Sequence, residues 1–372
     1  MKIGFDAKRF FYNHSGLGNY SRNMISYLQD NFLEDEYYLF AADQPHKIDF
    51  DFKQNTKIIH PQGDYNGVKA AYWRSKAILH EPEFQNLDIF HGLSAELPIG
   101  IRKTSVKSVL TIHDMIYLHF PHLYRFIDRK IYHWKTKKAC KEADKIIAIS
   151  QQTKDDIIRF YKVKPEKIEI VYQGCNAIFY QKYSKEQLQD IRKKYAIPNQ
   201  FILNVGTIEE RKNALLIVEA LHHSNIDFPL VIVGRKTAYT HKIEDYIQKH
   251  NLQKQVYIID NVSFEDLPLL YQSAELFIYP SVFEGFGIPI IEAFNSDTAV
   301  IVSDISVFKE VAGEAALFFE NNSKTDLADK IQRLLNNSNL KKDFVQKGKE
   351  RKMQFRGEAI AERLMSIYQS LY

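Results

Sequence analysis

Cysteine, excess charge of one sign and long apolar runs are all scarce in this sequence. Cys140 and Cys175 are the only cysteines in 372 residues, too few for a disulfide framework or a zinc site. The net charge of +4 is small for this length, so we expect no nucleic-acid partner. No stretch of about 18 apolar residues occurs that could span a membrane. The N-terminus carries Lys2 and Asp6 and is typical of a first strand rather than a signal peptide, so the cytoplasm is the expected location.

The length and the alternating patterns of the chain predict two α/β domains. A chain of 372 residues exceeds what one hydrophobic core usually supports. Short apolar runs alternate with helical patterns from end to end, which is typical of βαβ units and parallel sheets. The strands expected in the first half are residues 2–7, 37–42, 57–61, 87–92, 108–114, 144–150 and 167–174. The pattern restarts in the second half, where the expected strands are residues 201–206, 230–234, 256–260, 276–281 and 299–304.

The boundary between the two domains is expected near residues 175–182. The segment 181–200 is polar and helical, and the tail from residue 324 is helical to its end. We therefore predict fold class α/β, with doubly wound parallel-sheet domains at residues 1–178 and 179–355. Ligands bind such sheets at the carboxyl ends of the strands, so residues at strand ends are the first candidates for a site.

The segment SVFEGFGIPIIEAF, residues 281–294, has the character of an anion site. Gly285 and Gly287 allow a ligand to come close, and the proline that follows suits the first turn of a helix over 289–295. The free N–H groups and positive dipole end of that helix would face a phosphate. Glu284 and Glu292 flank the site, however, and their negative charge needs an explanation. The alternative is a glycine-rich turn before a short helix.

Two adjacent cations, Arg211 and Lys212, follow the strand expected at 201–206. They stand at the predicted start of a helix over residues 212–223. A guanidinium beside an ammonium suits a diphosphate, since one is a forked donor and the other a point charge. The alternative is a pair of solvated surface charges balanced by the neighbouring Glu209 and Glu210.

Gly16 and Gly18 lie in a glycine-rich segment, SGLGNYS, in the first 25 residues. It partly matches a dinucleotide fingerprint, but Ser21 replaces the third glycine and about ten residues separate it from the first strand. We interpret it as a mobile glycine loop near the ligand. His113 closes the strand expected at 108–114 and could hydrogen-bond a substrate, although a structural histidine is the more common case.

Three other kinds of chemistry can be weighed from the sequence. A glycosidase needs two carboxyls about 5–9.5 Å apart. Glu284 and Glu292 are eight positions apart, which in a helix is a rise of about 12 Å, so this pair is disfavoured. A metal-dependent transferase would use an acidic pair, for which Asp49-Phe50-Asp51 matches by letter but lies in a polar stretch. No GxxxxGK[ST] segment occurs, so a P-loop is excluded.

Five segments occur in an order that one known enzyme family shares. EGFGIPIIE places seven residues between Glu284 and Glu292, and AVIVSDISVFKEVAG follows it. GTIEERKN matches a phosphate-binding motif, and the HD of IHDMIYLHFP and ISQQTKDDI match motifs of an N-terminal domain. VSFEDLPLLYQSAELFIYPS also matches in order and spacing. Over nearly its whole length, the chain therefore resembles the retaining GT-B glycosyltransferases of family 4, in particular its mannosyltransferase-like members.

The resemblance implies a GT-B fold and a donor site. Two Rossmann-like domains would face each other across a cleft, and the last helix, about 356–372, would cross back to the N-terminal domain. Arg211 and Lys212 would bind the diphosphate of a nucleotide sugar, while Glu284 and Glu292 would accept hydrogen bonds from the sugar and the ribose. Further donor contacts are implied for a set from both domains, namely His113, Gly16, Gly18, Gly206, Val262, Ser263, Gly285, Phe286, Gly287 and Ile288.

The resemblance also implies a reaction that needs no metal or cofactor. A hexose would move from the nucleotide-diphosphate sugar to a glycan or lipid-linked glycan with retention of configuration. GDP-mannose is the first donor to test, and UDP-glucose or a UDP-hexosamine the next. A nucleotide-sugar epimerase or hydrolase, and a non-catalytic sugar-nucleotide-binding protein, are the alternatives on the same fold.

The segment 124–145 is basic and aromatic. It contains eight Lys or Arg residues and three Asp or Glu residues, with Tyr124, Phe126, Tyr132 and Trp134 among them. Such a helix could lie on an anionic membrane surface, where a lipid-linked acceptor would be found. The alternative, slightly favoured here, is a helix with a solvated basic face and an apolar side packed on the sheet.

Overall fold

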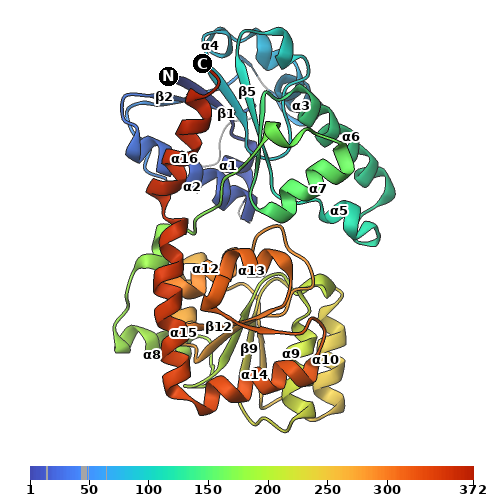
Figure 1. Ribbon diagram of the computed structural model, residues 1–372, viewed down its shortest axis with the longest axis vertical. Coiled ribbons are helices and arrows are strands. Elements are labelled where there is room, and N and C mark those ends of the chain that lie inside the picture. The colour runs from blue at the N-terminus through green and yellow to red at the C-terminus, as the bar shows by residue number, and fades with distance from the viewer. Residues whose placement is uncertain (14–15, 43–47, 49, 64) are drawn as a thin grey trace. The chain divides into compact units, whose positions relative to one another are not determined.

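A computed structural model describes residues 1–13, 16–42, 48, 50–63 and 65–372. The chain divides into two compact units (Figure 1). Unit 1 contains residues 1–174 and 356–372, and unit 2 contains residues 175–355. The sequence predicts the division at 178/179, a few residues further along the chain.

Unit 1 is built on a parallel sheet whose strands follow the predicted apolar runs. In the described residues this sheet has seven strands, in the order β3-β2-β1-β4-β5-β6-β7. Their bounds are β1 (Lys2–Asp6), β2 (Glu36–Phe40), β3 (Thr56–Ile59), β4 (Ile89–Gly92), β5 (Lys107–Ile112), β6 (Lys145–Ala148) and β7 (Ile168–Ile170). Parallel neighbours require crossover connections, and helices supply most of them. These are α1 (Lys8–Tyr12), α2 (Gly16–Asn31), α3 (Gly67–Ser75), α4 (Pro82–Gln85), α5 (Ile116–His119), α6 (Phe126–Glu142) and α7 (Gln151–Tyr161).

Unit 2 repeats this design with a six-stranded parallel sheet in the described residues, ordered β10-β9-β8-β11-β12-β13. Its strands are β8 (Ile202–Val205), β9 (Leu230–Val233), β10 (Val256–Ile259), β11 (Leu276–Tyr279), β12 (Ala299–Ser303) and β13 (Leu317–Phe319). The first five are predicted strands. β13 is not among the predicted strands, because three residues are too few for a pattern to develop.

The helices of unit 2 cover both faces of its sheet. They are α8 (Lys185–Lys194), α9 (Ala214–His223), α10 (Thr240–Lys249), α11 (Leu267–Ser273), α12 (Ile288–Asn295), α13 (Ser306–Ala312), α14 (Lys324–Asn336) and α15 (Ser338–Arg351). α8 is the polar helix predicted within 181–200, and it begins with a capping box between Ser184 and Gln187. The helices α9, α10 and α14 share one apolar core with alternate strand residues such as Ile232 and Ile278.

The last helix, α16 (Gly357–Gln369), belongs to unit 1, as predicted. Figure 1 shows α16, at the red end of the colour bar, beside α2. Tyr368 of α16 is fully buried, and its hydroxyl lies 2.6 Å from Nδ1 of His91 in β4. The chain therefore ends in the unit in which it began. Within the described residues, none of the helices combines the length and the apolar character that crossing a bilayer requires.

Both sheets have the strand order of a doubly wound fold, and in each sheet this order reverses direction at one position. In unit 1 the chain winds outward on either side of the neighbouring strands β1 and β4, and in unit 2 on either side of β8 and β11. The connections after the two strands of each pair leave in opposite directions and open a crevice at their carboxyl ends. Each unit therefore has one such switch point, where a ligand site is expected.

Candidate functional site

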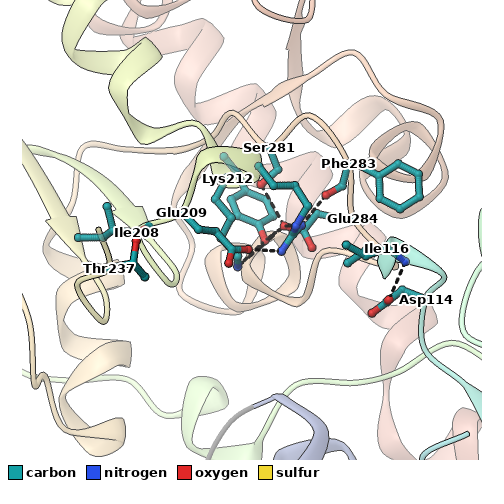
Figure 2. A network of polar contacts seen from close by, with 11 residues as sticks. Asp114, Ile116, Ile208, Glu209, Lys212, Thr237, Ser281, Phe283 and Glu284 are labelled. Carbon is teal, nitrogen blue, oxygen red and sulfur yellow. Dashed lines mark hydrogen bonds and ion pairs between the residues drawn. The ribbon is translucent and has the colours of Figure 1, made fainter. Parts of the chain in front are cut away.

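The two strongest sequence motifs meet at the switch point of unit 2. The segment 206–213 follows β8, and the segment 280–287 follows β11, its neighbour in the sheet. The backbone N–H of Val282 donates to the carbonyl of Arg211 over 2.9 Å, which joins the two loops. Charged residues that are far apart in the sequence are thereby brought together (Figure 2).

Arg211 and Glu284 form a buried ion pair across the two loops. Nη1 of Arg211 lies 2.7 Å from Oε1 of Glu284 and donates to the carbonyl of Phe283 over 2.5 Å. Nη2 donates to Oε1 of Glu209 over 2.6 Å. The Arg211 residue is only 8% exposed. Protein groups thus occupy both ends of the guanidinium, a pairing that was not predicted from the sequence.

Glu284 receives further donors at the same oxygen. The hydroxyls of Tyr279 and Ser281 donate to Oε1 over 2.7 and 3.0 Å. Within the described residues, the hydrogen bonds that this carboxylate accepts all end on Oε1. Figure 2 shows Ser281 and Lys212 close to this carboxylate. Burial opposes ionisation of Glu284, but Lys212 and Arg211 outweigh that effect and hold its pKa below the ordinary value.

Lys212 is the more accessible cation of the pair, with 20% of its side chain exposed. Its Nζ donates to the Tyr279 hydroxyl over 3.2 Å and lies 3.8 Å from Oε1 of Glu284. The side chain crosses Gly206, where an added Cβ would come within 2.8 Å of Nζ. Gly206 also has φ +146°, a conformation that favours glycine. Gly206 therefore provides the space in which Lys212 lies.

The predicted start of the helix at Lys212 is wrong. Arg211 and Lys212 lie in a 3-10 turn, η6 (Glu210–Lys212), and α9 begins only at Ala214. Asn213, between them, has φ +54°, in the left-handed region, which an α-helix cannot contain. The two cations are consequently held by side-chain contacts in the turn and not by a helix terminus.

The glycine loop before α12 has the predicted form. Gly287 has φ +117° and caps the helix, and Pro289 lies in its first turn. A Cβ on Gly287 would come within 3.0 Å of the Phe308 ring. Gly285 and Phe286 are buried, and the Phe286 ring packs edge-on against Phe355 at 5.8 Å. The loop is thus fixed by packing, and α12 begins at Ile288, one residue before the predicted start.

Glu292 lies within α12 and is held differently from Glu284. Its Oε2 accepts a hydrogen bond from the Tyr271 hydroxyl over 2.9 Å. Burial raises the pKa of Glu292 to about 7, opposed by Tyr271 and by the charge of Lys212. The surroundings therefore act in opposite directions on the two glutamates that flank the glycine loop. The two cations favour the ionised form of Glu284, whereas burial favours the protonated form of Glu292.

The prediction of a glycine loop at Gly16 and Gly18 is wrong, because both residues lie in the first turn of α2. The Gly18 N–H donates to Oδ1 of Asn13 over 3.1 Å, and a Cβ on Gly18 would lie 1.7 Å from the Asn13 carbonyl oxygen. A Cβ on Gly16 would meet nothing within 4 Å. Gly18 thus allows close packing at the start of a helix, while Gly16 has no such role.

His113 follows β5 in unit 1 and is held as a neutral ring. Its Nε2 lies 2.8 Å from the Leu93 carbonyl, so Nε2 carries the proton, and the ring packs edge-on against Tyr20 at 4.5 Å. Burial lowers the pKa of His113 to about 4, and the hydrogen bond to Leu93 only partly opposes this. His113 therefore has a structural role, which is one of the two roles considered for it from the sequence. Its Nδ1 carries no proton and can accept a hydrogen bond.

Val262 and Ser263, implied to lie by the base, are outside the regular helices and strands. Val262 and Ser263 are in the irregular segment between β10 and α11, and Ser263 precedes a 3-10 turn that starts at Phe264. Asp49, of the acidic pair weighed for a metal, lies outside the described residues. Within the described ranges, no cluster of three or more His, Cys, Asp or Glu side chains could hold a metal ion.

Tyr279, Ser281 and Tyr271 are the polar residues of this site that the sequence analysis did not single out. Tyr279 ends an apolar strand and is 1% exposed, so its pattern indicates only a core residue. Burial and the neighbouring Glu284 raise the pKa of Tyr279 well above its ordinary value, which keeps its hydroxyl protonated as a donor. Its position at the carboxyl end of a central strand was the available signal.

Both halves of the chain match known protein families. Residues 14–177 match the family described as Glycosyltransferase Family 4, and residues 187–351 match the family described as Glycosyl transferases group 1. The O-antigen chain mannosyltransferase RfbU of Salmonella typhimurium is 31% identical over 249 residues, which are 67% of this chain and 64% of that protein. The O-antigen chain mannosyltransferase B of Escherichia coli is 24% identical over the full length of both chains.

The fold also matches solved structures. Anabaena Alr3699/HepE, crystallised in complex with UDP and glucose, superposes with a TM-score of 0.74. The match covers 99% of both chains at 15% sequence identity, so it establishes a shared fold and no more.

Proposed function

The chain belongs to the group 1 glycosyl transferases of family 4, with the GT-B fold, and we propose that it moves a hexose from a nucleotide-diphosphate sugar to a glycan. The observation that carries the proposal is the Arg211–Glu284–Lys212 cluster at the switch point of the unit 2 sheet. Charged groups of both signs meet there beside a glycine-rich helix start, which suits a ligand with both a diphosphate and a polyol.

The three residues of this cluster have different contacts, and we assign them different roles. Arg211 is buried and holds Glu284, so it acts as a positioning residue for that carboxylate. Lys212 is more exposed and would face the diphosphate, together with the N–H groups from Gly285 to Ile288. Oε2 of Glu284 would accept a hydrogen bond from a sugar hydroxyl, since a carboxylate only accepts. The negative charge of Glu284 is thereby neutralised within the protein and need not repel the phosphates.

The other predicted residues take supporting roles in this proposal. Glu292 would accept from the ribose hydroxyls, and the segment at Val262 and Ser263 would lie by the base. No metal or cofactor takes part.

We propose transfer with retention. The bond from C1 to the diphosphate oxygen breaks as the acceptor oxygen attacks C1 from the same face, and the acceptor proton passes to the departing phosphate oxygen. Lys212 and the start of α12 stabilise the negative charge that grows on the diphosphate, which is where fixed donors accelerate a reaction most. Loss of one such donor costs about 10²–10³ in kcat.

The substitution Lys212→Met tests this role. We expect kcat to fall about a hundredfold, while Lys254→Met, at an exposed lysine of the same unit, leaves it unchanged. The anomeric configuration of the product, read by NMR, tests retention. An inverted product would overturn the same-face route, and donor turnover at the same rate without acceptor would indicate a hydrolase.

For the donor, we propose GDP-mannose first, because both relatives described above are named mannosyltransferases. A UDP-sugar is the alternative, since the HepE structure was obtained with UDP and glucose. Calorimetric titration with GDP-mannose, UDP-glucose and UDP-N-acetylglucosamine, without added metal, decides between them. Saturable binding of one alone identifies the donor, and binding of none would refute the proposed function.

The acceptor is proposed to be a growing surface glycan or its lipid-linked form, reached at the cytoplasmic side of the membrane. Helix α6 supports a peripheral membrane contact. Its buried residues are Thr136, Ala139 and Cys140, all small, whereas its large apolar side chains face outward. Phe126, Ile127 and Trp134 are 64%, 70% and 56% exposed. The alternative of an apolar side packed on the sheet accounts poorly for these exposures.

Flotation with vesicles tests the membrane contact. We expect binding to vesicles that contain phosphatidylglycerol at low salt, weaker binding at high salt, and none to pure phosphatidylcholine. The double substitution Ile127→Ser with Ile131→Ser should reduce flotation, since it removes apolar area from the exposed face. Absence of flotation with the anionic vesicles at low salt would rule the contact out.

A further inference from the structure

A basic hollow lies at the amino ends of the unit 1 strands, away from the switch point at their carboxyl ends. β6 begins at Lys145, and Lys167 directly precedes β7. Both residues line a hollow of about 560 Å³, together with residues from the end of α6 and from the turn after α7. Ligands of doubly wound sheets bind at the carboxyl ends of the strands. This hollow is therefore separate from the sites described so far.

The charge of this hollow is unbalanced. Its lining contains seven cations and two carboxylates, namely Arg102, Lys137, Lys141, Lys145, Lys162, Lys164, Lys167, Asp144 and Glu166. The excess of five positive charges is larger than the net charge of +4 that the whole chain carries. Cations that crowd together repel one another and destabilise the compact state. A purely structural role would not require so many of them.

Neither carboxylate neutralises this excess. Oδ2 of Asp144 accepts hydrogen bonds from the backbone N–H and the hydroxyl of Ser108 over 2.8 and 2.9 Å, so it holds the start of β5. The side chain of Glu166 is 70% exposed, and its Oε1 lies 3.9 Å from Nζ of Lys164. An exposed ion pair of this kind contributes little. The positive field of the hollow is therefore open to a ligand.

Lys145 and Lys167 have structural partners. Nζ of Lys145 donates to Oε1 of Glu169 over 2.9 Å. Nζ of Lys167 donates to the carbonyls of Cys140 and Lys141 over 2.8 and 3.2 Å, and so occupies the negative end of the α6 dipole. These contacts account for two of the seven cations, and they supply the positive charge that this helix end favours.

Four exposed cations of the hollow have no such partner. Within the part of the chain that the structure describes, they make no ion pair and their side chains donate no hydrogen bond to the protein; they are Arg102, Lys137, Lys141 and Lys162. The switch point of unit 1 is different, because Nη2 of Arg74 donates there to Oδ2 of Asp6 over 2.6 Å and to Oε2 of Glu96 over 3.1 Å. The cations at the amino ends of the strands thus lack the carboxylates that match Arg74.

Lys162 reaches the hollow from a backbone position that disfavours most side chains. It caps the C-terminus of α7 with φ +56°, in the left-handed region. Glycine or asparagine is the usual residue at such a cap. In the described chain, five of the nine non-glycine residues with positive φ are asparagines. Asparagine would serve this cap equally well, so the cap does not explain the positive charge of Lys162.

We propose that this hollow binds a soluble ligand with two or three linked phosphate groups, such as inorganic pyrophosphate, inorganic triphosphate or the phosphates of a nucleotide. Each lysine offers three N–H donors, and charge-assisted bonds to phosphate oxygens are strong. The volume of the hollow lies within the range of about 300–1,000 Å³ that small-molecule sites occupy. The inference goes beyond the proposed transferase function and does not rest on it.

A soluble ligand fits this hollow better than the head group of a membrane lipid. A lipid site would need exposed apolar side chains beside the cations, to contact the acyl chains. Cys140 and Tyr161 of the lining are only 1% and 8% exposed, and Val163 is partly buried. The exposed apolar side chains of α6, among them Ile127 and Trp134, do not line the hollow.

Calorimetry with inorganic triphosphate tests the site on the full chain. A phosphate chain could also bind at Lys212 in unit 2, so the titration uses the Lys212→Met variant. At about 0.15 M salt, where charges are screened beyond about 8 Å, we expect saturable binding of one triphosphate per chain and much weaker binding of sulfate. No saturable binding would overturn the inference. Sulfate binding as tight as that of triphosphate would overturn it too, because it would indicate a general anion-binding surface.

Lys162→Asn, in the same background, maps the binding to the hollow. The change removes one charge and suits the left-handed backbone, so we expect the unfolding temperature to be maintained. The affinity for triphosphate should fall about tenfold, the value for one hydrogen bond to a charged group. Lys69→Gln, at an exposed lysine of α3 outside the hollow, should leave it unchanged. An unchanged affinity in Lys162→Asn would overturn the inference, as would an equal loss in Lys69→Gln.

Two further arms distinguish the source of the phosphate and the link to the transferase. Vesicles that contain phosphatidylglycerol should not displace triphosphate, and a displacement that Lys162→Asn abolishes would overturn the choice of a soluble ligand. Lys162→Asn alone, without triphosphate, should transfer sugar at the wild-type rate, and a loss of transfer would contradict a separate site. If no nucleotide sugar binds while the triphosphate titration succeeds, the proposed function fails and the phosphate site stands.

Discussion

Replacement of Glu284 by glutamine tests the central contact of the donor site. The change keeps the size of the side chain and removes its charge. Arg211 then stays buried beside an amide, with Glu209 and the Phe283 carbonyl as its remaining acceptors. The Tyr279 and Ser281 hydroxyls can still donate to the amide oxygen, so most of the cost falls on the cation.

The magnitude follows from the burial of the pair. Removing one partner of a buried ion pair costs about 3–5 kcal/mol. Because Arg211 keeps Glu209 as a partner, we expect the low end, about 3 kcal/mol. In a unit of this size 1 kcal/mol shifts the unfolding temperature by about 2–4 °C, so unit 2 should unfold about 6–12 °C lower. Glu314→Gln, at an exposed glutamate of unit 2, should stay within about 0.5 kcal/mol.

A double-mutant cycle with Arg211→Met isolates the interaction itself. If the two side chains stabilise each other, the double variant should lose about 1–3 kcal/mol less than the sum of the single variants. The pKa of Glu284 is depressed in the folded protein, so its stabilisation is complete above the ordinary glutamate pKa of 4.5 and is lost as the pH falls through the lower folded value. The difference between wild type and Glu284→Gln should therefore shrink towards acid pH.

Additive effects would refute this reasoning. If the cycle closed to within about 0.5 kcal/mol, the buried contact between Arg211 and Glu284 would carry no coupling energy. A Glu284→Gln variant that retained full transfer activity would also count against the role of the carboxylate in binding the sugar. Chemical denaturation of unit 2, followed by intrinsic fluorescence and circular dichroism, supplies the free energies.

Three further outcomes are expected. Gly18→Ala should destabilise unit 1 by more than about 1 kcal/mol, because its Cβ would collide with Asn13, whereas Gly16→Ala should be neutral or stabilising, and thermal unfolding compares the two. The folded pKa of Glu292, about 7, lies above its ordinary 4.5, so stability should fall as the pH rises from 4.5 to 7. Glu292→Gln should remove this dependence and gain about 1–3 kcal/mol at pH 8, and an unchanged pH profile would contradict the raised pKa. EDTA should leave transfer unchanged in a radiolabel assay, because Lys212 and the start of α12 supply the positive charge at the diphosphate.

Local patterns were sufficient for most of the secondary structure. Apolar runs of four to six residues predict twelve of the strands, because a strand buried on both faces has a continuous apolar sequence. The short β13 has no such run, and Gly16 and Gly18 were misread because glycine pairs occur in loops and helix starts alike. Asn213 ends the turn at Lys212 in a left-handed conformation that no spacing rule foretells.

The candidate site was located by its motifs, but its contacts were not predictable. Arg211, Lys212 and Glu284 are recognisable because each follows a strand in a motif that resembles those of one family. Glu284 faces both cations because β8 and β11 are neighbours in the sheet. The crossover connections decide which strands are neighbours, and neither motif contains that information. The same holds for Tyr279, whose hydroxyl acquires a role only beside Glu284.

Chain length, strand periodicity and motif order thus establish the two α/β domains and the family, since each depends on residues that are close in the sequence. The order of the strands decides which loops meet, and burial decides which charges persist. The network of Asp6, Arg74 and Glu96 is decided entirely by the tertiary structure. Its three residues lie in unrelated segments, and only the path of the chain brings them to one switch point.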